Sequence, residues 1–222
     1  MGLGKSLVFL AAASGAVVIA CSGPPPVLQA GLRSIVQGGP QAPAATCNRS
    51  GDFIGVPIGT TDPNNVLVET GTEGIVLQCS IVPQGGPGPS NSYNVTVSAQ
   101  VNTGTAPGTV TFSGIFTPRV RDANNKPTAD TTQIPNIRGD FMDQAGVHLV
   151  QKDCYAQYTE ADPALLSGPS LPEAADVYAD PNGGRIWVSV FCPNAVNTNT
   201  GNQITKACQG TTTFRFENCA SH

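Results

Sequence analysis

From residue 47 onward, apolar and polar residues alternate along short runs of the chain. Within 95–101, Val and Ala occupy every second position, and Thr, Ser and Gln stand between them. Because successive side chains of a strand point to opposite faces, this period of two predicts strands that bury one face. We predict strands at Phe53–Ile58, Asn65–Glu69, Gly74–Val82, Ser92–Val101, Thr109–Thr117, Gly146–Gln151, Cys154–Thr159, Arg185–Cys192 and Thr211–Asn218.

Turn-forming residues separate these runs and leave little room for helix. Gly and Pro cluster between the runs, and they set backbone angles that stop a strand. Ser92–Val101 and Thr109–Thr117, joined by a short Gly/Pro loop, predict a hairpin. Helical turns are predicted only at Asp162–Gly168 and Pro172–Val177. We therefore expect an all-β fold, an antiparallel β-sandwich of jelly-roll or immunoglobulin-like type, with a β-barrel as the alternative.

The N-terminal end has the pattern of a secretory signal. Lys5 precedes the apolar run Leu7–Ala20, and Cys21 follows it. A transmembrane helix needs about 20 apolar residues, and this run is shorter. Residues 1–20 are therefore interpreted as a cleaved signal peptide.

The end of that run, Val18-Ile19-Ala20-Cys21, resembles the lipobox of bacterial lipoproteins. The resemblance implies cleavage directly before Cys21 and attachment of lipid, palmitate included, to that cysteine. Ordinary signal-peptide cleavage after Ala20 is the alternative, because Val18 and Ala20 suit that enzyme too. Ser22 follows the cysteine, which resembles the pattern of Gram-negative lipoproteins sorted to the outer membrane.

The cysteine count supports lipid attachment. The chain has seven cysteines, and an odd number leaves one thiol over in a secreted protein. If lipid occupies Cys21, six remain for three disulfides in an oxidising compartment. These six are Cys47, Cys79, Cys154, Cys192, Cys208 and Cys219.

Strand geometry narrows the pairing of the six cysteines. Cys208 and Cys219 flank one predicted strand, so they lie at its opposite ends and cannot be bonded to each other. We favour Cys192–Cys208, which closes the polar loop 193–207, over the alternative Cys154–Cys192. The favoured pattern is completed by Cys79–Cys154 and Cys47–Cys219, the latter because domain termini often lie close together.

Composition suggests one anchored domain and excludes two kinds of partner. Pro and Gly break up Ser22–Thr46, in which only Leu32–Val36 looks like a strand. We interpret 21–46 as a lipid anchor and tether, and 47–222 as a single domain. Charged residues make up 12% of the chain and the formal net charge is −4. Nucleic acid and anionic lipid surfaces attract clusters of Lys and Arg, so neither is expected as a partner.

No set of residues has the pattern of a catalytic site. The chain contains no G-x-S-x-G sequence. His148 lies in a strand-like run and is interpreted as a half-buried or surface histidine of a strand. Asp140 with Asp143, or Asp153 with Glu160, could form the carboxylate pair of a glycosidase, but fifteen acidic residues offer such pairs by chance.

No metal site and no cofactor are expected either. The chain lacks a C-x-x-C sequence, and its histidines have no cysteine at ligand spacing. The loops that could offer calcium oxygen ligands lack the Gly and the closing Glu of an EF-hand, so we interpret their side chains as Asx turns. These side chains are Asp122, Asn124 and Asp130 in one loop, and Asp176, Asp180 and Asn182 in another.

The runs Gly184–Trp187, Phe191–Asn194 and Phe214–Cys219 resemble the C-terminal ends of uncharacterised Gram-negative envelope lipoproteins. We expect a non-enzymatic lipoprotein of the cell envelope, held in the outer membrane by its lipid, with a display, structural or interaction role. The alternative is a carbohydrate-binding module or an envelope glycan hydrolase. An exposed line of Trp187, Tyr155 or Tyr158 favours that alternative. The partner is then a glycan or a protein.

Overall fold

The chain folds into strands that all join one sheet. The computed structural model describes residues 26–38, 54–56, 67–85, 92–102, 107–120, 123, 132–144, 146–158, 176–179, 183–197 and 208–220. A single 3-10 turn, η1 (Thr72–Gly74), is the only helical element among them. The strands are β1 (Gln29–Gly38), β2 (Ile54–Val56), β3 (Val68–Glu69), β4 (Ile75–Pro83), β5 (Tyr93–Val101), β6 (Gly108–Phe116), β7 (Ile134–Asp143), β8 (His148–Gln157), β9 (Val177–Tyr178), β10 (Gly184–Asn197) and β11 (Cys208–Cys219).

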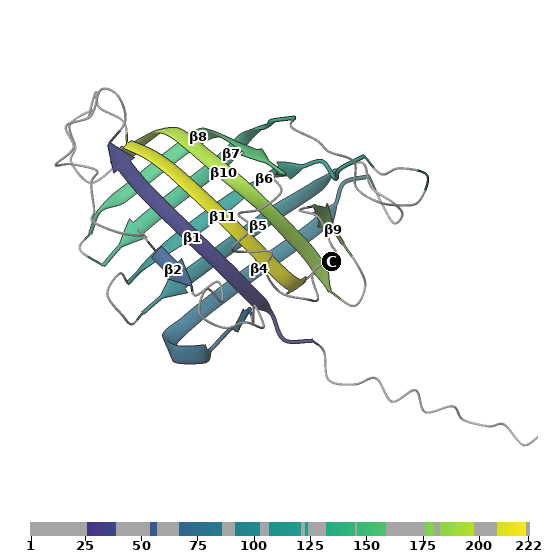
Figure 1. The fold of residues 1–222 in the computed structure, drawn as a ribbon, viewed down its shortest axis with the longest axis horizontal. Helices are drawn as coiled ribbons and strands as arrows, with labels where there is room; N and C mark the ends of the chain where they lie inside the picture. The colour runs from purple at the N-terminus through teal and green to yellow at the C-terminus, as the bar shows by residue number, and fades with distance from the viewer. Residues whose placement is uncertain are drawn as a thin grey trace, which may run out of the picture.

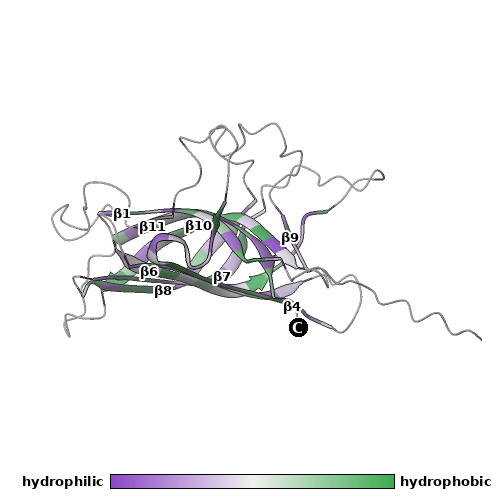
Figure 2. Cartoon of the chain, turned by 90° about the horizontal axis from the view of Figure 1, so that it is seen from below, coloured by the Kyte–Doolittle hydropathy of each residue, from purple (hydrophilic) through white to green (hydrophobic). Residues whose placement is uncertain are grey.

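The sheet is antiparallel, so the predicted all-β fold is confirmed. Its order is β2-β1-β11-β10-β8-β7-β6-β5-β4, with β3 paired to β1 and β9 paired to β10. The predicted hairpin of β5 and β6 is present, with Tyr93 opposite Phe116 and Val101 opposite Gly108. In Figure 1, β1, β11 and β10 cross in front of the strands β4–β7. Figure 2 shows the same two layers from below, with the inner faces turned toward each other.

The last residues of β11 close the curled sheet against β4. The Ile81 N–H donates to the Ala220 carbonyl over 2.9 Å, and the Ala220 N–H donates to the Cys79 carbonyl over 3.1 Å. A disulfide joins Cys79 to Cys219, whose Cα atoms lie 4.8 Å apart. One edge of the sheet thus returns to a strand in its other half, and the sheet is nearly closed and barrel-like.

The remaining edge of β4 is also occupied. The Leu77 N–H donates to Thr70 Oγ1 over 3.0 Å, and the Gly71 N–H donates to the Ile75 carbonyl over 2.7 Å. Pro83 has no N–H to offer. Because free edge groups recruit further strands, these contacts protect β4 against pairing with another chain.

Aromatic side chains fill the space between the two layers. Phe112 of β6 stacks on Phe214 of β11, with ring centroids 5.5 Å apart. Phe141 meets Phe112 edge to face, and Phe216 meets Phe214 in the same way. All four rings are fully buried, and burial of one such side chain contributes about 1.5–3 kcal/mol. The interior around these rings is a packed core.

Strand β1 corrects the predicted tether. Gln29–Gly38 lies inside 21–46, yet it pairs along its whole length with β11. Ala30, Leu32 and Val36 point into the core. The inward position between the last two is Ser34, whose polarity interrupts the apolar pattern that predicts strands. Ser34 Oγ is hydrogen-bonded to Thr212 Oγ1 over 2.8 Å, which makes its burial possible.

Bulges explain the other differences from the predicted strands. β7 was not predicted, because the pairing shifts between Ile134 and Ile137 and two apolar residues three apart both face inward. The two strands predicted at 146–151 and 154–159 are one strand, β8. Lys152 and Asp153 both face solvent there, so the alternation breaks without ending the strand.

Three further predictions lie wholly or partly outside the described residues. The predicted helix Asp162–Gly168 lies outside the described residues. Of Pro172–Val177, the structure describes only the last two residues, and Val177 begins β9 instead of ending a helix. Residues 193–197 of the predicted loop 193–207 belong to strand β10, and the rest of that range lies outside the described residues.

The disulfides correct the favoured pairing. Cys192 is bonded to Cys154 and not to Cys208, and Cys79 is bonded to Cys219. The favoured Cys192–Cys208, Cys79–Cys154 and Cys47–Cys219 pairs are therefore wrong, and the alternative Cys154–Cys192 is confirmed. The reason is that β10 does not end at Cys192, so no loop begins there. Cys208 is also disulfide-bonded; its partner lies outside the described residues, as does Cys47.

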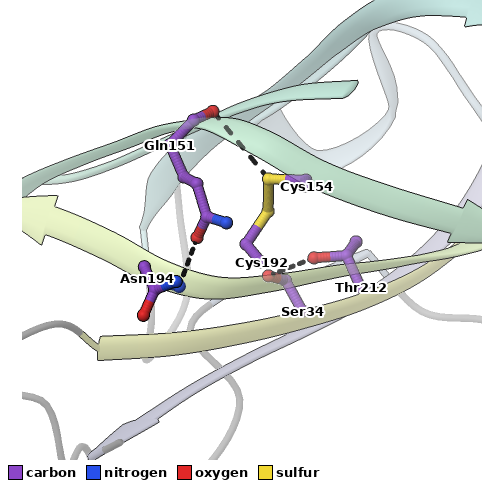
Figure 3. Close-up of a disulfide and its surroundings, with 6 residues drawn as sticks. All are labelled: Ser34, Gln151, Cys154, Cys192, Asn194 and Thr212. Carbon is purple, nitrogen blue, oxygen red and sulfur yellow. Dashed lines mark hydrogen bonds between the residues drawn. A yellow bond between two sulfur atoms is a disulfide. The ribbon is translucent and has the colours of Figure 1, made fainter. Parts of the chain in front are cut away.

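The Cys154–Cys192 disulfide lies in the core between β8 and β10 (Figure 3). A hydrogen bond joins the same two strands beside the disulfide. Gln151 Oε1 of β8 accepts it over 2.6 Å from the Asn194 N–H, which lies in the β10 bulge two residues after Cys192. Gly139 of β7 faces the two sulfur atoms. A Cβ at this position would lie 2.7 Å from Cys192 Sγ and 3.0 Å from Cys154 Sγ. The glycine therefore makes room for the disulfide.

Removal of the closing disulfide, by Cys79→Ala with Cys219→Ala, is expected to lower the free energy of unfolding by about 4 kcal/mol. The two cysteines are 140 residues apart in sequence, so the bond restricts a long segment of the unfolded chain. Urea denaturation of the oxidised protein and of the double variant measures the difference. An unchanged denaturation midpoint would contradict the closing role of this bond.

Gly139→Ala is expected to lower the free energy of unfolding by about 2 kcal/mol, because the new methyl group overlaps the disulfide sulfurs. In a Cys154→Ala, Cys192→Ala background the same substitution should cost less than about 1 kcal/mol, because both sulfur atoms are gone and only Phe112 Cε1, 3.1 Å from the added Cβ, stays close. Urea denaturation of the four proteins gives the coupling. Equal costs in both backgrounds would show that the glycine is required for another reason.

Candidate functional site

The two outer faces of the folded sheet differ in their exposure to solvent. On β10, the outward side chains Arg185, Trp187 and Ser189 are 4%, 2% and 5% exposed. On β4–β8, the outward side chains are exposed or half-buried. We call the latter the open face; its members include the polar residues Gln78, Ser80, Asn94, Thr96, Ser98, Gln100, Thr109, Thr111, Ser113, Arg138, Asp140 and His148 and the apolar residues Val76, Val82, Ile115 and Met142. The open face is where a partner can reach strand side chains.

Strand register arranges the open face in rows of polar side chains. Ser98, Thr111 and Asp140 are direct neighbours across β5, β6 and β7, and Thr111 Oγ1 donates to Ser98 Oγ over 3.1 Å. The next row runs from Gln100 through Thr109 and Met142 to His148. These residues alternate with buried ones such as Val110 and Phe112, so the alternation that builds the core also builds this surface.

An open groove of about 340 Å³ lies on this face between β6 and β7. Three hydroxyl side chains from β6 form one side, and a cation, a carboxylate and a thioether from β7 form the other. The lining residues are Thr109, Thr111, Ser113, Arg138, Asp140 and Met142. The volume lies at the lower end of the range for small-ligand sites.

Asp140 is the centre of the charged groups in the groove. His148 Nε2 lies 2.8 Å from Asp140 Oδ1, and Arg138 Nη2 lies 3.9 Å from Asp140 Oδ2. The side chain of Arg138 is 54% exposed, whereas those of Asp140 and His148 are 29% and 32% exposed. The carboxylate is thus fixed from two sides and still accessible from solvent.

The outer face of β10–β11 carries a second charged cluster, which is built for packing. Glu217 is paired with Arg215, and Arg185 Nη1 lies 3.8 Å from Glu217 Oε1. The Arg215 guanidinium lies over the Trp187 ring, 5.2 Å from its centroid, and the Arg185 guanidinium lies over the Tyr178 ring at 5.1 Å. Charges with so little exposure need such partners. We assign this cluster a structural role.

The structure brings two of the residues considered for chemistry, Asp140 and His148, together at the groove and separates the others. His148 is a half-buried strand histidine, as interpreted, but it contacts Asp140. Asp140 and Asp143 do not form a glycosidase pair, because Asp140 faces outward and Asp143 is buried. Asp143 Oδ1 accepts a hydrogen bond of 2.8 Å from the Val147 N–H in the β7–β8 turn. Asp153 is exposed on β8, and Glu160 lies outside the described residues.

Asp176 is the only one of the six calcium-ligand candidates that lies within the described residues. Asp176 is fully buried, and its Oδ1 accepts hydrogen bonds from the Arg119 and Val177 N–H groups, at 2.8 and 2.9 Å. Asp176 thus binds the backbone of the next residue and of a segment 57 residues away, which is a structural role other than the predicted Asx turn. Asp122, Asn124, Asp130, Asp180 and Asn182 lie outside the described part of the chain. Within that part, no three His, Cys, Asp or Glu side chains form a metal-binding group.

The aromatic residues proposed for glycan stacking are not arranged in an exposed line. Trp187 and Tyr158 are 2% and 4% exposed. Tyr155 is half-buried and stacks on Phe191, with ring centroids 5.3 Å apart. Apart from Asp140, the residues that line the groove were not singled out by sequence reasoning. Thr109, Thr111 and Ser113 lie in the predicted strand Thr109–Thr117, but Arg138 lies in β7, which was not predicted, so the two sides could not be combined.

The predicted lipid anchor lies outside the described residues. Cys21 and the apolar run before it belong to the part of the chain that is not described. Among the described ranges, no helix combines the length and the apolar character needed to cross a membrane. Lipid attachment at Cys21 therefore stays a prediction.

Glu217→Gln is expected to lower the free energy of unfolding by about 2 kcal/mol, because Arg185 and Arg215 lose their shared carboxylate. Glu69→Gln is the matched control. Glu69 accepts an exposed hydrogen bond from Gln29, and its loss should cost less than about 0.5 kcal/mol. Thermal or urea denaturation measures both. Equal small effects would contradict the structural role of the cluster.

Comparison of the chain with known protein families, curated proteins and solved structures found no match. The resemblance of the N-terminal and C-terminal runs to envelope lipoproteins therefore stays a prediction. The function of this chain has to be argued from its own residues.

Proposed function

We propose that this chain is an exported, lipid-anchored domain of the cell envelope that acts by binding a partner on its open face, without catalysing a reaction. The observation that carries the proposal is the contrast between the two outer faces. From Arg185 to Val190 the side chains of β10 are buried on both faces of the strand, whereas β4–β8 present rows of half-buried and exposed polar side chains. Such rows on a stable sheet are suited to recognition of an extended partner.

Export is supported by the disulfides. The Cys79–Cys219 and Cys154–Cys192 bonds are buried and join strands of the core. Disulfides of this kind form and persist outside the cytoplasm. They agree with the secretory signal expected at residues 1–20, and with use of Cys21 for lipid. More than one acyl chain on Cys21 would give stable anchoring, because each buried CH₂ contributes about 0.8 kcal/mol.

We also propose that the architecture is a flattened barrel, the alternative to the expected sandwich. The support is the continuity of one sheet from β1 to β4 and the return of β4 to the end of β11. In a sandwich, two separate sheets face each other. Here β10, in the layer with β1 and β11, is hydrogen-bonded to β8, so the sheet continues from one layer into the other.

The lipid anchor is tested by intact mass and fragment mass of the native protein. We expect loss of residues 1–20, acyl chains on Cys21, and disulfide-linked fragments for Cys79–Cys219 and Cys154–Cys192. An unmodified thiol at Cys21 would remove the anchor from the proposal.

The open face is tested by binding of the purified full-length protein, held in detergent micelles, to delipidated envelope material. Thr96→Arg with Gln100→Arg places two bulky charges on exposed positions of β5 and should weaken binding about tenfold. Gln37→Arg is the matched control, on an exposed position of β1. If all three proteins bind equally, or if none binds, the proposed function is wrong.

A further inference from the structure

The groove on the open face combines groups that can both donate and accept hydrogen bonds. Thr109, Thr111 and Ser113 contribute hydroxyls, each of which can do either. Arg138 contributes donors only, and Asp140 contributes acceptors only. A ligand that satisfies this set must itself carry many groups that donate and accept.

The charges in the groove cancel. Arg138 and Asp140 lie 3.9 Å apart at their nearest charged atoms, so the lining as a whole favours neither an anion nor a cation. Asp140 keeps acceptor capacity although it contacts His148, because an ionised carboxylate has about four lone-pair sites on its two oxygens. Two oxygens on one carbon are spaced to accept hydrogen bonds from two adjacent hydroxyl groups.

The groove also has apolar surface beside these polar groups. Met142 is 47% exposed and contributes a polarizable thioether, and the threonines contribute methyl groups. A sugar ring has the matching character, with hydroxyl groups at its rim and C–H groups on its faces. Beyond the groove, Ser98 and Gln100 continue the polar rows across β5, so a chain of sugars can follow the rows.

The geometry points to a neutral glycan with adjacent hydroxyl groups as the ligand of this groove, and this inference rests on the proposed binding role of the open face. Asp140 and Arg138 bind the adjacent hydroxyls. The β6 hydroxyls orient the ring, and Met142 packs against its C–H face. Addition of a peptide strand at β4 is a poorer alternative, because Thr70, Gly71 and Ala220 already occupy groups along that edge.

The test uses the full-length protein in micelles and delipidated envelope material in three forms: untreated, oxidised with periodate, and digested with protease. Periodate cleaves the bond between carbons that carry adjacent hydroxyls, so it should abolish binding, whereas protease should leave it intact. Asp140→Asn should weaken binding to untreated material about tenfold, as expected when hydrogen bonds to a charged group are lost. Thr111→Val should weaken it about threefold.

Thr211→Val is the matched control, because Thr211 is half-buried on the outward side of β11, away from the open face. It should bind like the unmodified protein. Thermal unfolding of each variant checks the fold, and Arg138→Gln replaces Asp140→Asn if the latter does not fold.

Three other outcomes would contradict the glycan ligand, its position in the groove or the proposed function. Loss of binding with protease and not with periodate would identify a protein partner, which contradicts the glycan and leaves the proposed function standing. Loss with periodate but unchanged binding of both groove variants would place a glycan elsewhere on the molecule. No binding to untreated material would contradict the proposed function itself.

Discussion

The structure depends on the pairing of the end of β11 with the free edge of β4. Along most of its length β11 lies between β1 and β10, and at Cys219–Ala220 it meets β4 through a disulfide and two backbone hydrogen bonds. One strand thereby joins both halves of the curled sheet. The halves bury their inner, apolar faces against each other, so a contact that holds them in register also holds the phenylalanine core together.

Closure has a second consequence, because it leaves outer faces of different character. Arg185, Trp187 and Ser189 of β10 are buried, and Arg215 and Glu217 of β11 are half-buried and bound in charge and ring contacts with them. The outward residues of β4–β8 remain open, and their polar side chains are held in rows by the sheet. A surface of this kind needs little ordering when it binds, since its strands are already fixed by the core. The groove between β6 and β7 is where these rows contain both charge and apolar surface.

Sequence reasoning reached the fold class through alternation, and it failed where alternation was interrupted. From Val95 to Val101 and from Val110 to Phe116, every second residue faces the core. Both strands were therefore predicted correctly. Ser34 is a polar residue on an inward position, and its partner Thr212 is 178 residues away. No local pattern could show that pair, so β1 was taken for a tether. Bulges hid β7 and divided β8. The groove could not be assembled from sequence, because half of its lining lies on β7.

The disulfide pairing could not be predicted for the same reason, because it depends on which strands are neighbours in the sheet. Cys154 and Cys192 meet only because β8 and β10 are neighbours and Gly139 leaves space for the sulfurs. Sequence spacing alone favoured a loop-closing bond from Cys192, and the continuation of β10 to Asn197 removes that loop.

Oxidation of Met142 tests the central claim most directly. Met142 is half-exposed in the groove, and the other methionine, Met1, belongs to the predicted signal peptide. Met142 of the purified mature protein should therefore form sulfoxide readily with dilute peroxide, and envelope material should slow that reaction. If Met142 is oxidised at the same rate with and without envelope material that binds the protein, the open face is not the binding surface.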